Sequence, residues 1–222
     1  MTEGLWLYSY WRSSAAYRVR IALNLKGLLY KIIPVHLVNN GGEQHSDEFR
    51  ALNPQRMVPT LIDGRRVIRQ SLTIVEYLDE AYDGDMALLP SLKRDRARVR
   101  ALAQLIACDV HPLNNLRVMQ YLENELSIGQ VERDRWMQHW MMEGFSAFEQ
   151  LLSDSPSTGS FCEGDRPSLA DICLVPQVYN GYRFKVDMTR YPIIERIYRE
   201  CLSLPQVDAA QPENQPDAPA VA

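Results

Sequence analysis

The stretch YSYWRSSAAYRVRIALNLKG, residues 8–27, decides the fold of the first part of the chain. Its aromatic beginning is typical of a β-strand. Further on, apolar Val19, Ala22 and Leu23 recur at helical spacing, and a glycine marks the end of the helical pattern. We therefore expect a strand, a tight turn and then a helix from about residue 15 to residue 26.

Two adjacent serines, Ser13 and Ser14, stand at the junction between that strand and that helix. Serine commonly caps a helix N-terminus, so one of the two can be purely structural, and the second is surplus to capping. A helix N-terminus and a donated hydroxyl proton both lower the pKa of a thiol placed beside them. Ala15 follows the serines and the turn has no cysteine, so any such thiol would come from a ligand.

The segments that follow predict a small α/β domain. A short helical run ends at Asn53-Pro54, Asp63-Gly64 is a strong hairpin signal, and Ser71 opens a helix with one apolar face. The order is strand, helix, strand, helix, then two strands and a helix, and we assign this domain to residues 1–83. After the first strand and helix, the expected elements are a strand over 30–37, a helix over 46–52, a hairpin over 60–69 and a helix from residue 71.

Only helical patterns remain after about residue 90. Ser168 and Asp171 have the spacing of a capping box, which we interpret as structural. We expect an all-helical bundle domain over residues 90–212 and a polar, loosely ordered tail over residues 213–222. The expected helices cover residues 91–125 with a bend at Pro112, residues 131–152, a segment from residue 168, and residues 191–203.

Composition and charge narrow the function classes. The chain has 222 residues, of which 46% are hydrophobic and 23% charged, which is ordinary for a globular protein with a substantial core. The net charge of −4 gives no reason to expect nucleic acid as a partner, and no apolar run reaches the length of a membrane span. The four cysteines include no CxxC pair, the four histidines show no metal-binding spacing, and the N-terminus lacks the apolar stretch of a signal peptide. These features favour a cytoplasmic protein with reduced thiols and no metal.

Two further motifs are candidates for ligand binding. Val58-Pro59 precedes the hairpin, and a cis peptide bond there would leave the Val58 backbone free to pair with an extended ligand. A plain proline at a strand start is the alternative. Gln70-Ser71 stands at a second strand-to-helix junction, where the first N–H groups of a helix form an anion site. Capping by Ser71 alone is the commoner explanation of that pair.

Together these motifs resemble the glutathione transferase superfamily over essentially the whole chain. The strings RSSAAYRVRIALNLKG, GGEQHSDEFRALNPQRMVPTL, QSLTIVEYL, CDVHPLNNLRV and SLADICLVPQVYNGYRFKVD are similar to those of its zeta class. The resemblance implies a thioredoxin-like N-terminal domain with a cis-proline at Val58-Pro59, followed by a helical domain. Ala15 departs from the family, which commonly has cysteine there, so the resemblance does not extend to activities that use that thiol.

The resemblance also implies how glutathione would be bound. By this resemblance, Ser13 would stabilise the glutathione thiolate, with Ser14 as the second candidate. Gln70 and Ser71 would bind the γ-glutamyl end. His111 is expected to belong to the ligand shell and not to act as a base. The full set implied by motif position is Ser13, Ser14, Ala15, Gln44, Val58, Gln70, Ser71, Asp109, His111, Asn115 and Arg117.

The resemblance also implies a substrate with carboxylates, and motif position gives the residues that would bind them. Arginine suits this role, because a planar guanidinium pairs with a carboxylate through two hydrogen bonds. Arg12 and Arg183 are the first candidates, and Arg117 is the third. With the two serines, Arg12 and Arg183 complete the predicted catalytic set.

The resemblance implies a glutathione-dependent isomerase that converts maleylacetoacetate to fumarylacetoacetate in phenylalanine and tyrosine breakdown. Reversible addition of the glutathione thiolate to the cis-alkene would leave a single bond that rotates, so glutathione would act as a cofactor. Maleylpyruvate is the alternative substrate, and a general conjugating transferase or a non-enzymatic binding module are the rival functions. A thiol oxidoreductase is disfavoured by the missing cysteine. The family also implies a homodimer.

Overall fold

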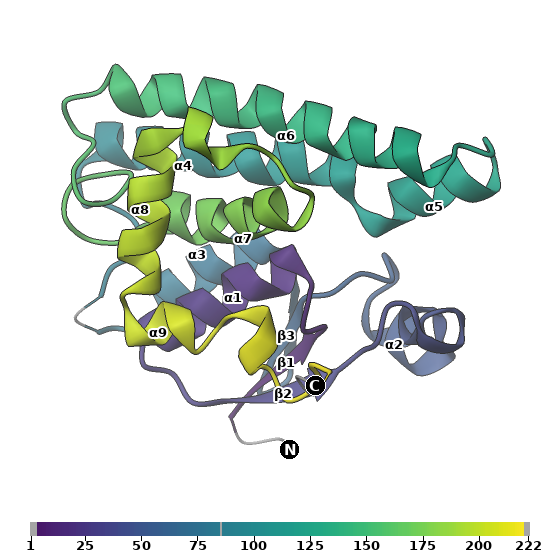
Figure 1. Ribbon diagram of the computed structural model, residues 1–222. Coiled ribbons are helices and arrows are strands. Elements are labelled where there is room, and N and C mark those ends of the chain that lie inside the picture. Colours follow the sequence, from purple (N-terminus) through teal and green to yellow (C-terminus); the bar gives the residue numbers. More distant parts are fainter. Residues whose placement is uncertain (1–3, 85, 220–222) are drawn as a thin grey trace. The chain divides into compact units, whose positions relative to one another are not determined.

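The computed structural model describes residues 4–84 and 86–219, which form two compact units (Figure 1). The first unit takes the described residues up to Leu88 together with those from Ser203 onward, and the second unit is Leu89–Leu202. The domain boundary predicted at residue 212 therefore differs from the observed one. The reason is that the chain after residue 202 packs on the first unit and hydrogen-bonds to it.

The first unit is built on a four-stranded mixed sheet with the order β2-β1-β3-β4. β1 pairs with β2 in parallel, and β3 is antiparallel to both β1 and β4. The strands are β1 (Leu5–Ser9), β2 (Tyr30–Pro34), β3 (Thr60–Asp63) and β4 (Arg66–Arg69). The predicted α/β order is confirmed. The hairpin loop lies one residue later than predicted, at Gly64 and Arg65, because Asp63 still pairs with Arg66.

Four helices complete the first unit: α1 (Ser14–Leu25), α2 (Asp47–Leu52), α3 (Ser71–Ala81) and the short α9 (Pro205–Asp208). α1 packs against both α3 and α9, so most of its surface is buried (Figure 1). Its apolar residues Val19 and Leu23 join Leu7, Leu61 and Ile74 in the core. Two arginines of the same helix are buried with them, and both bear on the site described below.

The second unit contains helices and no strand among its described residues. These are α4 (Lys93–Gln104), α5 (Leu116–Asn124), α6 (Gln130–Ser153), α7 (Leu169–Arg183) and α8 (Pro192–Leu202). The single helix predicted over residues 91–125 is wrong in its middle. A π-helical turn, Leu105–Val110, and a 3-10 turn, His111–Asn114, separate α4 from α5. Pro112 lies in the 3-10 turn, where it has no N–H to continue an α-helix.

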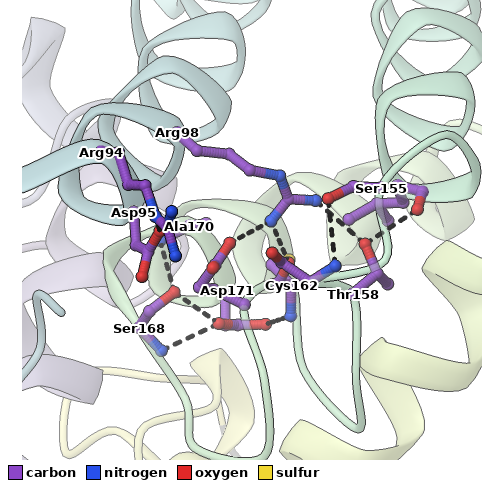
Figure 2. Close-up of polar contacts among 12 residues, drawn as sticks. Arg94, Asp95, Arg98, Ser155, Thr158, Cys162, Ser168, Ala170 and Asp171 are labelled. Carbon is purple, nitrogen blue, oxygen red and sulfur yellow. Dashed lines mark hydrogen bonds and ion pairs between the residues drawn. The ribbon is translucent and has the colours of Figure 1, made fainter. Parts of the chain in front are cut away.

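The predicted capping box at the start of α7 is confirmed and forms part of a buried polar cluster (Figure 2). Asp171 accepts hydrogen bonds from the backbone N–H groups of Ser168 and Cys162, each at 2.8 Å, and from the Ser168 hydroxyl at 2.8 Å. Burial raises the pKa of Asp171 above its ordinary value, and these hydrogen bonds oppose the rise. Because Cys162 lies in the loop before α7, this carboxylate fixes both the loop and the helix start.

Arg98 of α4 extends the same cluster (Figure 2). It donates to the Cys162 carbonyl at 2.7 Å and to the Thr158 hydroxyl at 2.9 Å, and it forms an ion pair with Glu163. The cluster therefore connects α4 to the loop before α7 and has a structural role in the second unit.

In the part of the chain that the structure describes, no helix is both long enough and apolar enough to cross a membrane.

Replacing Asp171 by Ala leaves two buried N–H groups without their acceptor, so we expect the free energy of unfolding to fall by about 3 kcal/mol. Chemical denaturation measures this loss. Asp165→Ala is the matched control, because that exposed carboxylate accepts one hydrogen bond, from Ser160, in the same loop and should cost at most about 0.5 kcal/mol. Equal effects of the two changes would contradict the structural role of the buried cluster.

Candidate active site

Four segments of the first unit meet at one edge of its sheet because of the strand register. β1 and β2 are parallel and end together, since Ser9 pairs with Pro34. β3 runs the opposite way, so its first residue, Thr60, pairs with Tyr8 near the end of β1 and with Arg69 at the end of β4. The ends of β1, β2 and β4 and the start of β3 therefore share this edge, which we call the site edge. Open α/β sheets bind ligands outside the carboxyl ends of their strands.

A small apolar cluster holds the segments at the site edge together. Its residues come from the ends of β1 and β2, from α2, and from the chain just before β3. The cluster fixes the backbone of the loops that carry the predicted polar residues. Its buried members are Tyr10, Val35, Phe49 and Val58, against which Tyr8, Trp11, Leu37 and Leu52 pack.

Ser13 caps α1, and its hydroxyl is therefore fixed at the helix start. Its Oγ atom accepts a hydrogen bond from the Ala16 N–H at 3.2 Å. A serine hydroxyl that accepts in this way still has its own proton to donate, so capping and activation of a thiol can fall on the same residue. Ser14 is the first residue of α1 and is buried. The predicted pair thus divides into a half-buried cap and a buried neighbour.

Arg12 and Ala15 flank the two serines. The Arg12 guanidinium lies 5.3 Å from the centre of the Trp11 ring, within cation–π distance. Both Arg12 and Ala15 are half-buried. The structure thus places four consecutive predicted residues at the junction of β1 and α1, with Arg12 and Ser13 before the helix and Ser14 and Ala15 in its first turn.

Gln70 and Ser71 stand at the start of α3, which is the second strand-to-helix junction at the site edge. Gln70 has a φ of +70°, which a residue with a side chain rarely adopts, and its amide donates to the Gln55 amide oxygen at 2.8 Å. The buried Ser71 hydroxyl accepts from the guanidinium of Arg18 at 3.2 Å. The sequence analysis did not identify Arg18 or Gln55 as partners of this junction. For Arg18, the signal that could have been used was the presence of an arginine inside an otherwise apolar helix.

The loop before β3 brings Val58 to the same edge. The Val58-Pro59 peptide bond is cis, as the resemblance implied. The side-chain amide of Asn53 donates to the Met57 carbonyl at 2.7 Å and to the Thr60 hydroxyl at 3.2 Å. Asn53 thus holds both ends of the loop.

Gln44 lies in the chain that follows β2, and it carries an unsatisfied buried acceptor. Its Nε2 atom donates to the Leu37 carbonyl at 3.2 Å, whereas its Oε1 atom has no hydrogen-bond partner among the described residues. Gly42 makes room for this amide, because a Cβ atom at that position would lie 2.4 Å from Nε2. An unpartnered buried oxygen is costly, and an incoming N–H donor would satisfy it.

Five predicted residues belong to the second unit. Asp109 is exposed in the π-helical turn and His111 opens the 3-10 turn. Asn115 caps α5 by accepting from the Arg117 N–H at 3.1 Å. Arg183 ends α7, with its guanidinium 4.6 Å from the centre of the Phe184 ring.

Among the described residues, no group of three or more His, Cys, Asp or Glu side chains is arranged to hold a metal ion.

Comparison with known proteins gives consistent matches. Residues 7–86 match the family model of the glutathione S-transferase N-terminal domain. A probable maleylacetoacetate isomerase of Vibrio cholerae is 52% identical over 212 residues, which is 96% of this chain and 97% of that protein. The chain belongs to the zeta-class glutathione transferase family.

Two solved structures of this family are similar over their whole length. A holo maleylpyruvate isomerase, a bacterial zeta-class enzyme, has a TM-score of 0.93 and 44% identity, and the match covers 96% of this chain and 100% of that one. A maleylacetoacetate isomerase of Methylobacterium extorquens AM1, with bound malonate and glutathione, also has a TM-score of 0.93, with 42% identity and coverage of 97% and 100%. The zeta-class fold of this chain is therefore shown.

We expect Gln70→Gly to raise the free energy of unfolding by about 1 kcal/mol, because relief of the strained φ exceeds the added freedom of glycine in the unfolded chain. Thermal or chemical denaturation measures the change. Gln70→Ala is the matched control, since it removes the same amide but keeps the strain, and it should bring no such gain. A destabilised Gln70→Gly variant would contradict the view that this backbone is strained.

Proposed function

We propose that this protein is a glutathione-dependent cis–trans isomerase that converts maleylacetoacetate to fumarylacetoacetate. The observation that carries the proposal is the meeting of the Ser13 turn, the Val58-Pro59 loop and the Gln70-Ser71 junction at one edge of the sheet. Relatives with the names maleylacetoacetate and maleylpyruvate isomerase match over nearly the whole chain and support it.

Glutathione fits the residues at the site edge. The N-terminus of α3, with Gln70 and Ser71, suits its γ-glutamyl carboxylate, because helix N–H groups and dipole favour an anion there. Val58 offers its backbone to an extended peptide, and the unpartnered Gln44 oxygen offers an acceptor. We expect Gln70→Gly to bind glutathione more weakly, since the amide is lost. By motif position we also propose the following residues for the ligand set: Ser14, Ala15, Asp109, His111, Asn115 and Arg117.

When bound, glutathione supplies a thiolate that adds reversibly to the cis-alkene, so that the double bond becomes a single bond that can rotate. Ser13 contributes the proton of its hydroxyl as a hydrogen bond toward the sulfur, and the start of α1 contributes its dipole. A free thiol has a pKa near 8.5, so stabilisation of the anion raises the fraction that reacts at pH 7. Ser14 is the second candidate for this hydrogen bond to the sulfur.

The substrate's carboxylates require cations, and we assign them to Arg12 and Arg183, with Arg117 third. Arg12 precedes the activating serine by one residue, so it would place a carboxylate beside the thiol. Malonate bound in the relative from Methylobacterium extorquens is also a dicarboxylate, which is consistent with an anionic substrate. We further propose that the protein is a cytoplasmic homodimer that acts in phenylalanine and tyrosine breakdown and binds neither nucleic acid nor membranes.

The direct test supplies glutathione with maleylacetoacetate and, separately, with maleylpyruvate, and follows loss of the cis-alkene. We expect fast conversion of maleylacetoacetate, and faster turnover of maleylpyruvate would instead assign the second substrate. An aromatic halide tests for general conjugation, and we expect little product because the proposed site binds anions. Failure to bind or isomerise either substrate would overturn the proposal.

Replacing Ser13 by Ala removes both the cap and the proposed thiol hydrogen bond. We expect a loss of about 1 kcal/mol in unfolding free energy and a fall in turnover of about a hundredfold at saturating glutathione. Ser46→Ala is the matched control, because Ser46 caps α2 through the same 3.2 Å bond to the third residue of the helix. It should show the stability loss alone. Near-normal turnover of Ser13→Ala would remove Ser13 from the proposed role.

A further inference from the structure

The end of the chain packs on the first unit beside α1. We call residues 203–219 the C-terminal segment. Its helix α9 contacts α1, and the Asn24 side chain of α1 donates to the Gln206 carbonyl at 2.9 Å. Val207 and Ala210 are fully buried. The segment is therefore held on this unit as far as Asp217, which hydrogen-bonds to Trp11. The loose tail predicted over residues 213–222 differs from these contacts up to that residue, and its last three residues lie outside the described part of the chain.

Arg20 of α1 ties the C-terminal segment to the end of β1. It is fully buried, and its Nε atom donates to the Ala210 carbonyl at 3.0 Å. Its other nitrogens donate to the Ser9 hydroxyl at 3.2 Å and to the carbonyls of Tyr10 and Trp11 at 3.4 and 2.9 Å. A rigid guanidinium that bonds four groups at once fixes their relative positions.

Asp217 of the C-terminal segment provides a second connection to the end of β1. Its carboxylate accepts the backbone N–H of Trp11 at 2.9 Å. Both backbone polar groups of Trp11 are thus held, its N–H by Asp217 and its carbonyl by Arg20. The Ser13 N–H closes the turn by donating to the Tyr10 carbonyl at 2.9 Å. The backbone just before Ser13 is therefore clamped between α1 and the C-terminal segment.

We infer that Arg20 and Asp217 are positioning residues for the Ser13 hydroxyl, and that the C-terminal segment acts as a strap on the active-site turn. The inference rests on the proposed function, since it gives the strap the task of placing the group that activates the thiol. Catalytic groups must be held to within a fraction of an ångström, and small displacements cost much of the rate. Neither residue is assigned any contact with glutathione or substrate.

The charges of the strap are consistent with this role. Burial lowers the pKa of Arg20 to about 10, so its guanidinium stays protonated at neutral pH. Four groups oppose that shift: Tyr30 and Tyr17, which neighbour Arg20 within the fold, and Asp217 and Glu213 of the C-terminal segment. The segment thus supplies the carboxylates that accompany a buried cation next to the turn.

Asp217→Ala tests the inference without disturbing the core. Hydrogen exchange of the Trp11 amide in the ligand-free protein should become about tenfold faster, because the hydrogen bond from this amide to a carboxylate is lost. With glutathione and the cis substrate, kcat should fall about tenfold while KM changes little, because a misplaced catalytic group slows the chemical step. Asp217→Asn keeps an oxygen acceptor and should restore both quantities most of the way.

Asp208→Ala is the matched control, because that carboxylate lies in the same segment and accepts a hydrogen bond from the Gln211 side chain instead of from the turn. It should behave as the wild type. Unchanged exchange in Asp217→Ala, unchanged kcat despite faster exchange, or an Asp217→Asn variant that behaves like Asp217→Ala would each overturn the inference. A wild-type protein that fails to isomerise either substrate would instead overturn the proposed function, and exchange would still report whether the strap holds the turn.

Discussion

The register of the four-stranded sheet is the constraint on which the rest of the candidate site depends. Pairing of Ser9 with Pro34, of Tyr8 with Thr60 and of Thr60 with Arg69 brings four separate segments to one edge. A slip by one residue would turn every side chain of a strand to the opposite face and displace its loop. The serine turn, the cis-proline loop and the start of α3 therefore meet as one candidate site only because the strands pair in this way.

Buried arginines extend that constraint from the sheet to the helices. Arg18 donates to Ser71 and so links α1 to the start of α3. Arg20 gathers the Tyr10, Trp11 and Ala210 carbonyls, although burial of its charge is costly and lowers its pKa to about 10. The strained φ of Gln70 lies at the same edge. Stability is thus given up close to the residues that we assign to glutathione, as is common for functional sites.

Local pattern predicted most of the first unit, because helical periodicity and the Asp63-Gly64 signal are contained within short segments. The same approach failed where the local structure depends on residues that are distant in the sequence. The polar tail sequence gives no sign that Asp217 binds the Trp11 N–H, and Pro112 predicted a bend where the chain leaves the α-helix altogether. Two serines in sequence do not say which one caps, since that depends on the turn geometry. Gln44 and the residues of the second unit came only from family resemblance, because no local rule marks them.

We expect the site edge to activate glutathione as a cofactor that is returned unchanged. The most direct measurement supplies the protein with an excess of maleylacetoacetate over glutathione and follows both the cis-alkene and the free thiol. A cofactor role gives complete conversion to the trans product with the thiol concentration unchanged at the end. Conversion that stops when the glutathione is exhausted, with one thiol lost for each substrate consumed, would contradict it and identify a conjugating transferase.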